Sequence, residues 1–469
     1  MVINSIPFLL FFCVVFCLYF FPNMRTKWQN SVLFLSSLFF YGFADLKILP
    51  LLVCAILLFW ILGNVIAENL IDAKRGNLYV CIGITLGIGL LLYFKYLNFF
   101  IQSFADLFSY IGLKNNFETL NIIMPLGISF FTFRLISYIV DIRRKEIVPV
   151  SLLEFATYIS FFPCILSGPI DRSVNFLPQL ARSRRFNADL AIEGCRQILW
   201  GMFKKMVIAD SLSLFVNKDV ATSNGSTLAI VAIMYSIQLY ADFSGYSDMA
   251  IGVGKLLGIR INPNFRYPYF SRSIAEFWNR WHMSLLSWFR YYIYFPLGGS
   301  RCTKGKVIRN TFIVFLVSGL WHGANWTFVF WGLFHAILFL PLLLCENRIR
   351  YKSSTPYKVT DSFKILLVFG MVTIGWIVFR CHGMAEVWLY IEKLFSPSLF
   401  ARPEGVIRAL PSIIFAVIMF MIEWYKKEEE FPLANMDGNR ICRWGIYVFL
   451  ILSIIYYQGK PADFIYFKF

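Results

Sequence analysis

The stretch from Asn310 to Cys345, NTFIVFLVSGLWHGANWTFVFWGLFHAILFLPLLLC, contains no Asp, Glu, Lys or Arg. As one continuous helix it would reach ~54 Å, well beyond a hydrocarbon core of ~30 Å. We therefore expect it to break, tilt or fold back, and Gly323 is the natural place. The limb from Asn310 to Trp321 would measure ~18 Å, which places His322 at membrane depth. A titratable side chain there indicates a functional site. The alternatives are a neutral histidine hydrogen-bonded between helices, or an interfacial turn with Trp anchors.

The composition is that of an integral membrane protein with many helical spans. Hydrophobic residues make up 58% of the chain, charged residues only 15%, and the mean hydropathy is +0.63, values that exclude a soluble globular class. The net charge of +17 does not indicate nucleic-acid binding, because the Lys and Arg residues lie in short loops between apolar runs, as the positive-inside rule predicts. We expect one transmembrane domain over residues 1–469. The run Ile6–Phe21 lacks a basic n-region and a cleavage site, and is expected to be a retained span.

The basic loops orient the predicted spans. Such loops follow the first, third and fifth runs, so the N-terminus is expected outside. The expected spans are Ile6–Phe21, Val32–Phe43, Ile48–Ala67, Leu78–Tyr93, Ile122–Val140, runs near Met206–Val216 and Leu228–Val253, the central stretch, Phe363–Val378, Ala409–Ile422 and Trp444–Ile455. The apolar stretch Tyr158–Ser167 lies between basic residues and is expected to be re-entrant or interfacial. The total is about 11–12 crossings, with the C-terminus outside and the basic segment Lys255–Arg309 inside.

The chain contains only four histidines. His335 follows His322 by a helical rotation of ~220°, so the two would not share a face, and His335 is expected to be a core or interfacial residue. His382 follows a span and is expected in a solvated loop.

His282 lies in a different setting. An apolar face with helical spacing surrounds it, formed by Trp281, Leu285, Trp288 and Tyr292. One interpretation is an amphipathic helix in the cytoplasmic interface. The other is a funnel wall, in which Arg280 and Arg290 meet an anionic donor.

A second polar cluster runs from Gln238 to Asp248 within a predicted span. Its carboxylates, Asp242 and Asp248, need partners at such a position. They either brace Arg or Lys side chains of the basic segment or line a polar tunnel. The spacing of His, Cys, Asp and Glu predicts no metal site.

Five stretches together resemble the membrane-bound O-acyltransferase family. They are PLGISFFTFRLISYIVDIRR (125–144), FFPCILSGPI (161–170), YADFSGYSDMAIGVGKLLGIRINPNFRYPY (240–269), FWNRWHMSLLSWFRYYIYFPLGGSR (277–301) and WHGANWTFVFWGLFHA (321–336). The similarity extends along the whole chain and is greatest to the bacterial branch of alginate, peptidoglycan and exopolysaccharide O-acetyltransferases. It implies an all-α protein with a ring of transmembrane helices, re-entrant and interfacial helices, and a central tunnel.

The resemblance also implies roles for individual residues. His322 matches the family's invariant histidine, to which catalysis is ascribed, and His282 matches a second, less essential one. The C-terminal segment 464–469, FIYFKF, is similar to the FIYFQF ending of these acetyltransferases, and Tyr466 is thereby a candidate acyl relay; a simple interfacial anchor is the alternative. The sequence departs from the family pattern in Arg134, in Tyr291, in Lys468, and in residues 43–45, which lack the usual Trp. These departures leave the donor and the acceptor open.

The resulting hypothesis is acyl transfer from a cytoplasmic thioester, with acetyl-CoA as the expected donor and no bound cofactor, to a cell-surface polysaccharide. His322 would be the general base. The candidate tunnel and oxyanion residues are Trp321, Asn325, Trp326, Arg290 and Asp242. The expected location is the bacterial inner membrane, in contact with its lipids. Because the chain contains no soluble domain with a Ser/His/Asp set, an extracytoplasmic SGNH-type partner is expected.

Three rival functions remain open at this point. The first is D-alanyl transfer to teichoic acid. In those systems a motif similar to the terminal FIYF is carried by a separate small membrane protein. Here the motif is part of the same chain, which favours acetyl transfer. The second is a flippase or channel that uses the histidines and carboxylates for conduction. The third, lipid or protein acylation, is disfavoured by the GGSR and FIYF signatures.

Overall fold

The computed structural model describes residues 1–21, 25–113, 117–345, 356–436, 439–458 and 464–465. These residues form two compact units. The first comprises Met1–Ala191 with Gly254–Asn262, and the second comprises Ile192–Val253 with Pro263–Phe469. The described residues contain helices and no strand, which confirms the all-α class.

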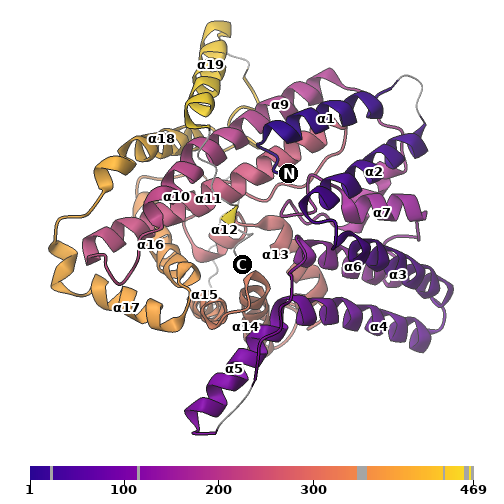
Figure 1. Ribbon diagram of the computed structural model, residues 1–469, viewed down its shortest axis with the longest axis horizontal. Coiled ribbons are helices and arrows are strands. Elements are labelled where there is room, and N and C mark those ends of the chain that lie inside the picture. The colour runs from indigo at the N-terminus through magenta and orange to yellow at the C-terminus, as the bar shows by residue number, and fades with distance from the viewer. Residues whose placement is uncertain (22–24, 114–116, 346–355, 437–438, 459–463, 466–469) are drawn as a thin grey trace. The chain divides into compact units, whose positions relative to one another are not determined.

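The first unit is built from antiparallel apolar helices. Its elements are α1 (Ile6–Tyr19), α2 (Thr26–Ala44), α3 (Leu49–Glu68), α4 (Ala73–Leu91), η1 (Leu92–Tyr96), α5 (Leu97–Tyr110), α6 (Ile128–Arg143), α7 (Leu152–Ser160) and α8 (Ser173–Leu180). Helices α3, α4 and α6 lie side by side (Figure 1). The predicted fourth span, Leu78–Tyr93, is longer than expected, because a π-helical turn, η1, carries the helix on into α5.

A buried arginine ties α6 to the segment predicted to be re-entrant. Arg134 is 1% exposed, and its guanidinium donates to the carbonyl oxygens of Tyr158 and Pro169 at 3.3 and 3.1 Å. Helix α7 ends at Ser160, and residues 161–170 follow as buried, non-helical chain. Such backbone carbonyls need internal donors at membrane depth, and Arg134 supplies them. The Arg that departs from the family pattern is thus part of the scaffold of this unit.

The second unit contains the central stretch and the long helix α11. Its elements are α9 (Ala188–Met202, which begins in the first unit), η2 (Phe203–Ala209), α10 (Asp210–Val216), α11 (Gly225–Leu256), η3 (Pro268–Phe270), α12 (Ile274–Trp278), α13 (Met283–Phe289), η4 (Arg290–Tyr294), α14 (Lys304–His322), α15 (Trp326–Leu344), α16 (Asp361–Arg380), α17 (Met384–Leu394), η5 (Pro397–Phe400), α18 (Val406–Tyr425) and α19 (Arg440–Tyr457). Its core is strongly aromatic and includes the fully buried Trp200, Trp331 and Trp376.

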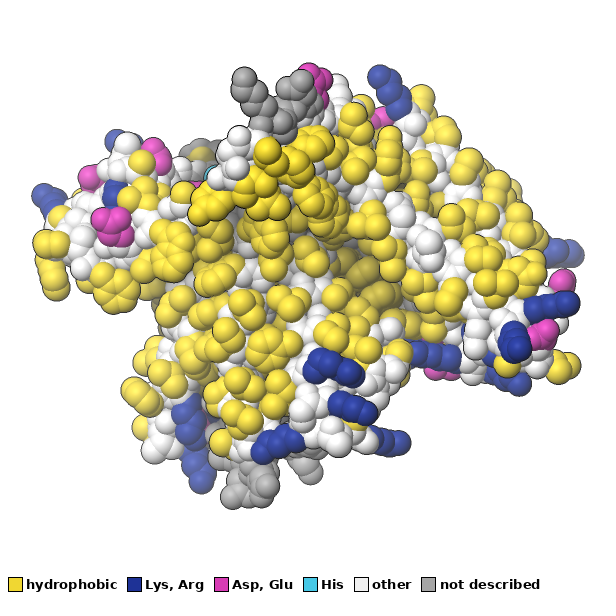
Figure 2. Space-filling view, turned by 90° about the horizontal axis from the view of Figure 1, so that it is seen from below, with side chains coloured by type: hydrophobic (Ala, Val, Ile, Leu, Met, Phe, Trp, Pro, Cys, Tyr) yellow, Lys and Arg dark blue, Asp and Glu magenta, His cyan; other side chains and the backbone are white. Residues whose placement is uncertain are grey.

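Seven helical segments among the described residues are long and apolar enough to cross a membrane. They are Leu49–Glu68, Ala73–Tyr110, Gly225–Leu256, Trp326–Leu344, Asp361–Arg380, Val406–Tyr425 and Arg440–Tyr457. Large apolar side chains on them point outward; Leu366 is 68% and Ile414 is 52% exposed. On the face shown in Figure 2, hydrophobic side chains cover most of the surface, and Lys and Arg side chains gather toward its margins. This is the surface of a multi-pass membrane protein.

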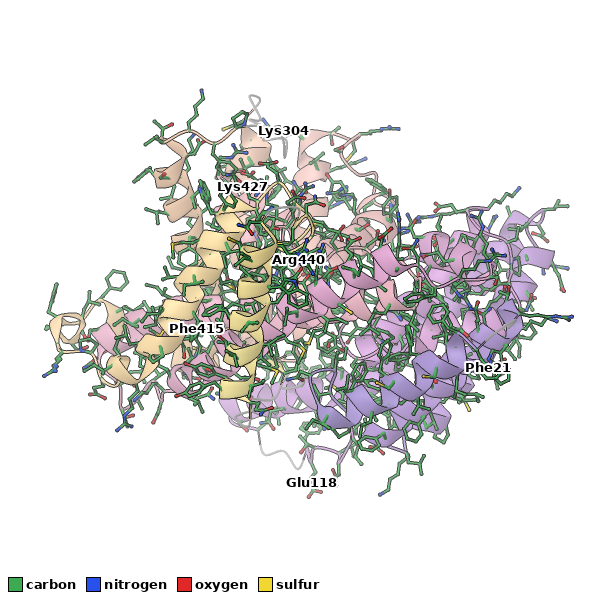
Figure 3. The ribbon with its side chains drawn as sticks, turned by 90° about the horizontal axis from the view of Figure 1, so that it is seen from above. Phe21, Glu118, Lys304, Phe415, Lys427 and Arg440 are labelled. Atoms are coloured by element: carbon green, nitrogen blue, oxygen red, sulfur yellow. The ribbon has the colours of Figure 1, made fainter. Side chains whose placement is uncertain are left out.

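Basic residues mark one end of the second unit. Figure 3 shows Lys304, at the start of α14, and Lys427, just after α18, at the same end of this unit, with Phe415 nearer the other end of α18. Helices α18 and α19 pack through the rings of Phe415 and Phe449, whose centroids lie 6.1 Å apart. By the positive-inside rule, the end that carries Lys304 and Lys427 is expected in the cytoplasm.

Candidate active site

The uncharged central stretch breaks at the predicted place. Helix α14 ends at His322, Gly323 is extended, and α15 starts at Trp326. A Cβ atom on Gly323 would lie 2.1 Å from Cε2 of Phe328, so the turn leaves no room for any side chain. Asn325 caps the new helix, its Oδ1 accepting from the Thr327 backbone N–H at 3.0 Å. The sequence therefore places His322 on the last turn of one helix, directly before a reversal of the chain.

The two helices of this hairpin approach each other closely, as Figure 1 shows. A Cβ on Gly319 would lie 2.2 Å from the carbonyl oxygen of Phe328, and one on Gly332 would lie 2.4 Å from that of Phe315. Small residues at such positions let membrane helices pack backbone to backbone. The glycines thereby fix how His322 is presented to α15.

His322 lies among aromatic rings. It is 5% exposed. Its ring centroid is 5.1 Å from that of Trp331 on α15 and 5.3 Å from that of Phe379 on α16, both nearly perpendicular to it. Edge-to-face contacts of this kind hold a ring in a defined orientation. The site is thus built from three helices of one unit.

His282 reaches the same site from a break between two short helices. The spacing of Trp281, Leu285, Trp288 and Tyr292 predicts one continuous helix. That prediction is wrong at its start, because α12 ends at Trp278 and α13 begins only at Met283. His282 between them has φ 44° and ψ 52°, a left-handed conformation that a residue with a side chain adopts only at a cost. This backbone turns the imidazole inward, where it is 2% exposed.

Asn264 fixes the proton on the His282 ring. The Asn264 amide nitrogen donates to Ser247 Oγ at 3.1 Å, which leaves its Oδ1 facing Ser284 Oγ and His282 Nδ1, the latter at 3.3 Å. An amide oxygen only accepts, so Nδ1 carries the hydrogen and Nε2 keeps its lone pair. His282 lies outside the spanning helices, and burial lowers its pKa to about 3, so the ring stays neutral at physiological pH.

The two histidines share one cavity. Its volume is about 230 Å³, and its lining includes His282, His322 and Arg290. Most of the other lining side chains are apolar, among them Leu285, Phe289, Phe315, Phe339 and Leu343. His322 is buried while Arg290 is exposed, so the cavity leads from the surface to the imidazoles. This arrangement supports the funnel-wall interpretation of this segment.

The other predicted tunnel and oxyanion residues lie in different places. Trp321 stands between the histidines, its ring 5.8 Å from that of His282 and 4.9 Å from that of His322. Asn325 caps α15, and its Nδ2 donates to the His382 carbonyl oxygen at 2.7 Å. Trp326 is 56% exposed. None of these three is among the residues that line the cavity.

The carboxylates of α11 are paired with lysines. Asp242 binds Lys205 at 2.8 Å, and Asp248 binds Lys204 at 2.5 Å. Two alternatives were open for these carboxylates, bracing basic side chains of the segment Lys255–Arg309 or lining a polar tunnel. The structure shows basic partners, but both lysines come from the π-helix η2, an element that brings consecutive lysines into the core. The signal was present in the sequence as two lysines directly before an apolar run.

The remaining histidines have the predicted surroundings. His335 is fully buried among aromatic rings, with Trp278 and Trp331 both 4.9 Å from it, and it is absent from the cavity lining. His382 is exposed in the turn after α16. Tyr466, the candidate relay, lies outside the described residues, but its neighbour Ile465 is described and buried in the second unit. Asn264 is a site residue that the sequence patterns did not indicate, since its stretch, INPN, enters only through the resemblance to the family.

Comparison with known proteins identifies the family of the chain. The model of the membrane-bound O-acyltransferase family matches residues 140–383, just over half of the chain. A Pseudomonas aeruginosa protein named "Probable alginate O-acetylase AlgI" is 36% identical over 84% of this chain and 75% of its own length. The peptidoglycan O-acetyltransferase of Helicobacter pylori is 36% identical over 93% and 91%. The teichoic acid D-alanyltransferase of Bacillus subtilis is 34% identical over 55% and 69%. The chain belongs to the membrane-bound O-acyltransferase family.

Proposed function

We propose that this membrane O-acyltransferase takes an acetyl group from a cytoplasmic thioester, with acetyl-CoA as the donor, and delivers it for O-acetylation of a cell-surface polysaccharide. The observation that carries the proposal is the single cavity that joins two buried histidines to an exposed arginine. The relatives whose similarity covers most of this chain are named for acetylation of alginate or peptidoglycan. The similarity to the D-alanyltransferase covers 55% of this chain. This difference favours acetyl transfer over D-alanyl transfer.

The chemistry assigned to His322 is general base catalysis. A hydroxyl is a weak nucleophile until its proton is removed. As the hydroxyl oxygen attacks the thioester carbonyl, the His322 imidazole accepts its proton. When the tetrahedral intermediate collapses, the C–S bond breaks and the imidazolium returns the proton to the leaving thiolate. Such a base accelerates a reaction by ~10²–10⁴-fold.

His282 and Arg290 have separate assignments. Since Asn264 holds the hydrogen on Nδ1 of His282, the Nε2 lone pair can accept a second hydrogen bond at the reacting centre. Arg290 lies on the cavity lining and is exposed; its guanidinium suits the phosphates of the donor. These positions support entry of an anionic thioester past Arg290.

The delivery step is assigned to the C-terminal segment and a partner. Tyr466 would supply the attacking hydroxyl, so that its phenolic oxygen takes the acetyl group from the thioester as a phenyl ester and passes it on outside the membrane. An extracytoplasmic SGNH-type acetyltransferase would complete the transfer onto sugar. The terminal FIYF signature supports this division of labour.

The test is the variant His322→Ala, compared with wild type in cells that make the polymer. We expect the protein to insert at normal levels and the acetylation of the polymer to be lost, because the variant lacks the proposed general base. The measurements are polymer-bound acetate and transfer of label from radioactive acetyl-CoA in isolated membranes. Product at the wild-type level would refute the catalytic assignment. A wild-type membrane fraction that never consumes the thioester would favour a transporter instead.

A further inference from the structure

Asp242, a carboxylate of the buried polar cluster in α11, makes contacts beyond its pair with Lys205. Asp242 is 2% exposed, and its Oδ1 is 2.8 Å from Lys205 Nζ. Lys205 also pairs with Asp210 at 2.8 Å. Lys205 thus joins two buried carboxylates. Buried carboxylate oxygens need hydrogen-bond donors.

The C-terminal segment supplies such a donor. The backbone N–H of Ile465 donates to Asp242 Oδ2 at 2.9 Å. A hydrogen bond to an ionised carboxylate is roughly twice as strong as a neutral one. Because the donor is the backbone N–H of Ile465, the bond fixes the position of the main chain there and does not depend on the side chain at that position.

Aromatic rings also hold Phe464, the residue that precedes Ile465. Phe464 is 2% exposed, and its ring lies 4.9 Å from that of Tyr246 and 6.1 Å from that of Phe243. Phe243 directly follows Asp242, and its ring also lies 4.6 Å from that of His282. Phe243 therefore lies between Phe464 and His282, the second histidine of the cavity.

We propose that Asp242 is a positioning residue that docks the start of the C-terminal segment, Phe464 and Ile465, beside the histidine pair, with Lys205 bound to the same carboxylate. The docking itself follows from the contacts of Asp242 and Ile465. Its consequence for transfer rests on the proposed function, because the docked residue Ile465 immediately precedes Tyr466. Asp242 thus acts on the tail rather than on the thioester.

The chain offers a matched control in Asp248. It lies on the same helix, is paired with the neighbouring lysine of η2, Lys204, and accepts from Gln197 at 3.0 Å. Asp248→Ala removes a partly buried Asp–Lys pair without touching the tail. In Asp242→Ala, Lys205 keeps Asp210 as a partner. Asp242→Asn keeps an acceptor oxygen and loses only the charge.

The first readout is the accessibility of the C-terminus, which does not depend on activity. The full-length protein in lipid nanodiscs is treated with carboxypeptidase, and release of the terminal residues is followed by intact mass. Loss of a hydrogen bond to a charged group raises the undocked population on the order of tenfold. We expect digestion to be about tenfold faster in Asp242→Ala, intermediate in Asp242→Asn, and unchanged in Asp248→Ala. Equal rates in Asp242→Ala and wild type would overturn the proposal.

The second readout is acetyl transfer in the same preparations, with Tyr466→Phe as a reference. The proposal predicts that Asp242→Ala lowers transfer about as far as Tyr466→Phe does, at an unchanged KM for the donor. A released tail with full transfer would overturn the positioning role while leaving His322 and the proposed function intact. Full activity in His322→Ala would refute the proposed function, and the digestion result would still decide the docking.

Discussion

At the scale of single residues, the site depends on which ring nitrogen holds a proton. Asn264 is 1% exposed and presents an oxygen to His282, which is the usual device for selecting a histidine tautomer. The left-handed backbone of His282 places the ring where this contact can form. The strain is tolerated because the Met283 backbone N–H donates to the Asn264 carbonyl oxygen at 2.9 Å, so the same residue holds both backbone and ring.

A charge-changing substitution tests this arrangement. Asn264→Asp places a carboxylate at the imidazole, and an opposite charge at that distance raises the pKa of His282. In the wild type, burial keeps the pKa of His282 at about 3, so the ring should contribute no inflection to the rate between about pH 5 and 8. In the variant we expect the rate to fall as the pH drops through the raised pKa, since His282 then takes up a proton.

The measurement is a pH–rate profile of acetyl transfer in membranes. Ser284→Ala is the control, because Ser284 also donates to Asn264 Oδ1 but its removal adds no charge. A profile for Asn264→Asp with the shape of the wild-type profile would contradict the tautomer assignment.

At the scale of elements, the α14–α15 hairpin carries the main histidine and depends on glycine. Gly319→Ala would place a methyl group against the carbonyl oxygen of Phe328, and a backbone atom cannot move aside as a side chain can. Overpacking of this kind costs about 1–3 kcal/mol. We expect a lower midpoint of thermal unfolding in detergent, together with reduced transfer, because His322 shifts with the end of α14.

Gly370→Ala is the matched control, since it lies within α16 and a Cβ there meets nothing within 4 Å. It should leave the midpoint unchanged or raise it slightly, because alanine favours the helix. Equal midpoints for the two variants would show that close packing at Gly319 is unimportant.

The π-helices are a second feature at this scale. The element η2 carries Lys204 and Lys205 into the core, and η4 begins at Arg290, on the lining of the cavity. A π-helical turn shifts the side chains that follow it relative to an α-helix, and such turns are concentrated at functional sites. The charged residues that the site uses are thus presented by irregular helices, which hydrophobic periodicity does not predict.

At the scale of the whole molecule, the prediction concerns orientation in the membrane. Basic residues follow the first, third and fifth predicted spans, and this pattern predicts that both termini lie outside. Single cysteines introduced by Lys74→Cys and Glu428→Cys should therefore face the cytoplasm, whereas Glu118→Cys, in the loop after α5, should face outward. All three native side chains are exposed, so access to the reagent depends only on the side of the membrane.

Labelling with an impermeant maleimide in intact cells measures this directly. We expect Glu118→Cys to react at once and the other two only after permeabilisation, above the background of the native cysteines. Reaction of Lys74→Cys in intact cells would reverse the predicted topology, and the thioester would then have to enter from the opposite side.

The all-α class, the positions of most long helices and the break at Gly323 could be predicted from the residues alone, because they depend on local properties: runs of apolar residues, their length relative to a membrane, and the absence of charge. His282 and His322 were candidates on the same basis. Three contacts required the folded chain: Asn264 sets the tautomer of His282, Lys205 rather than the basic segment binds Asp242, and Ile465 docks on the same carboxylate. Asp242 and Ile465 lie 223 positions apart in the chain. A contact of that range depends on how helices pack, and no local pattern records it.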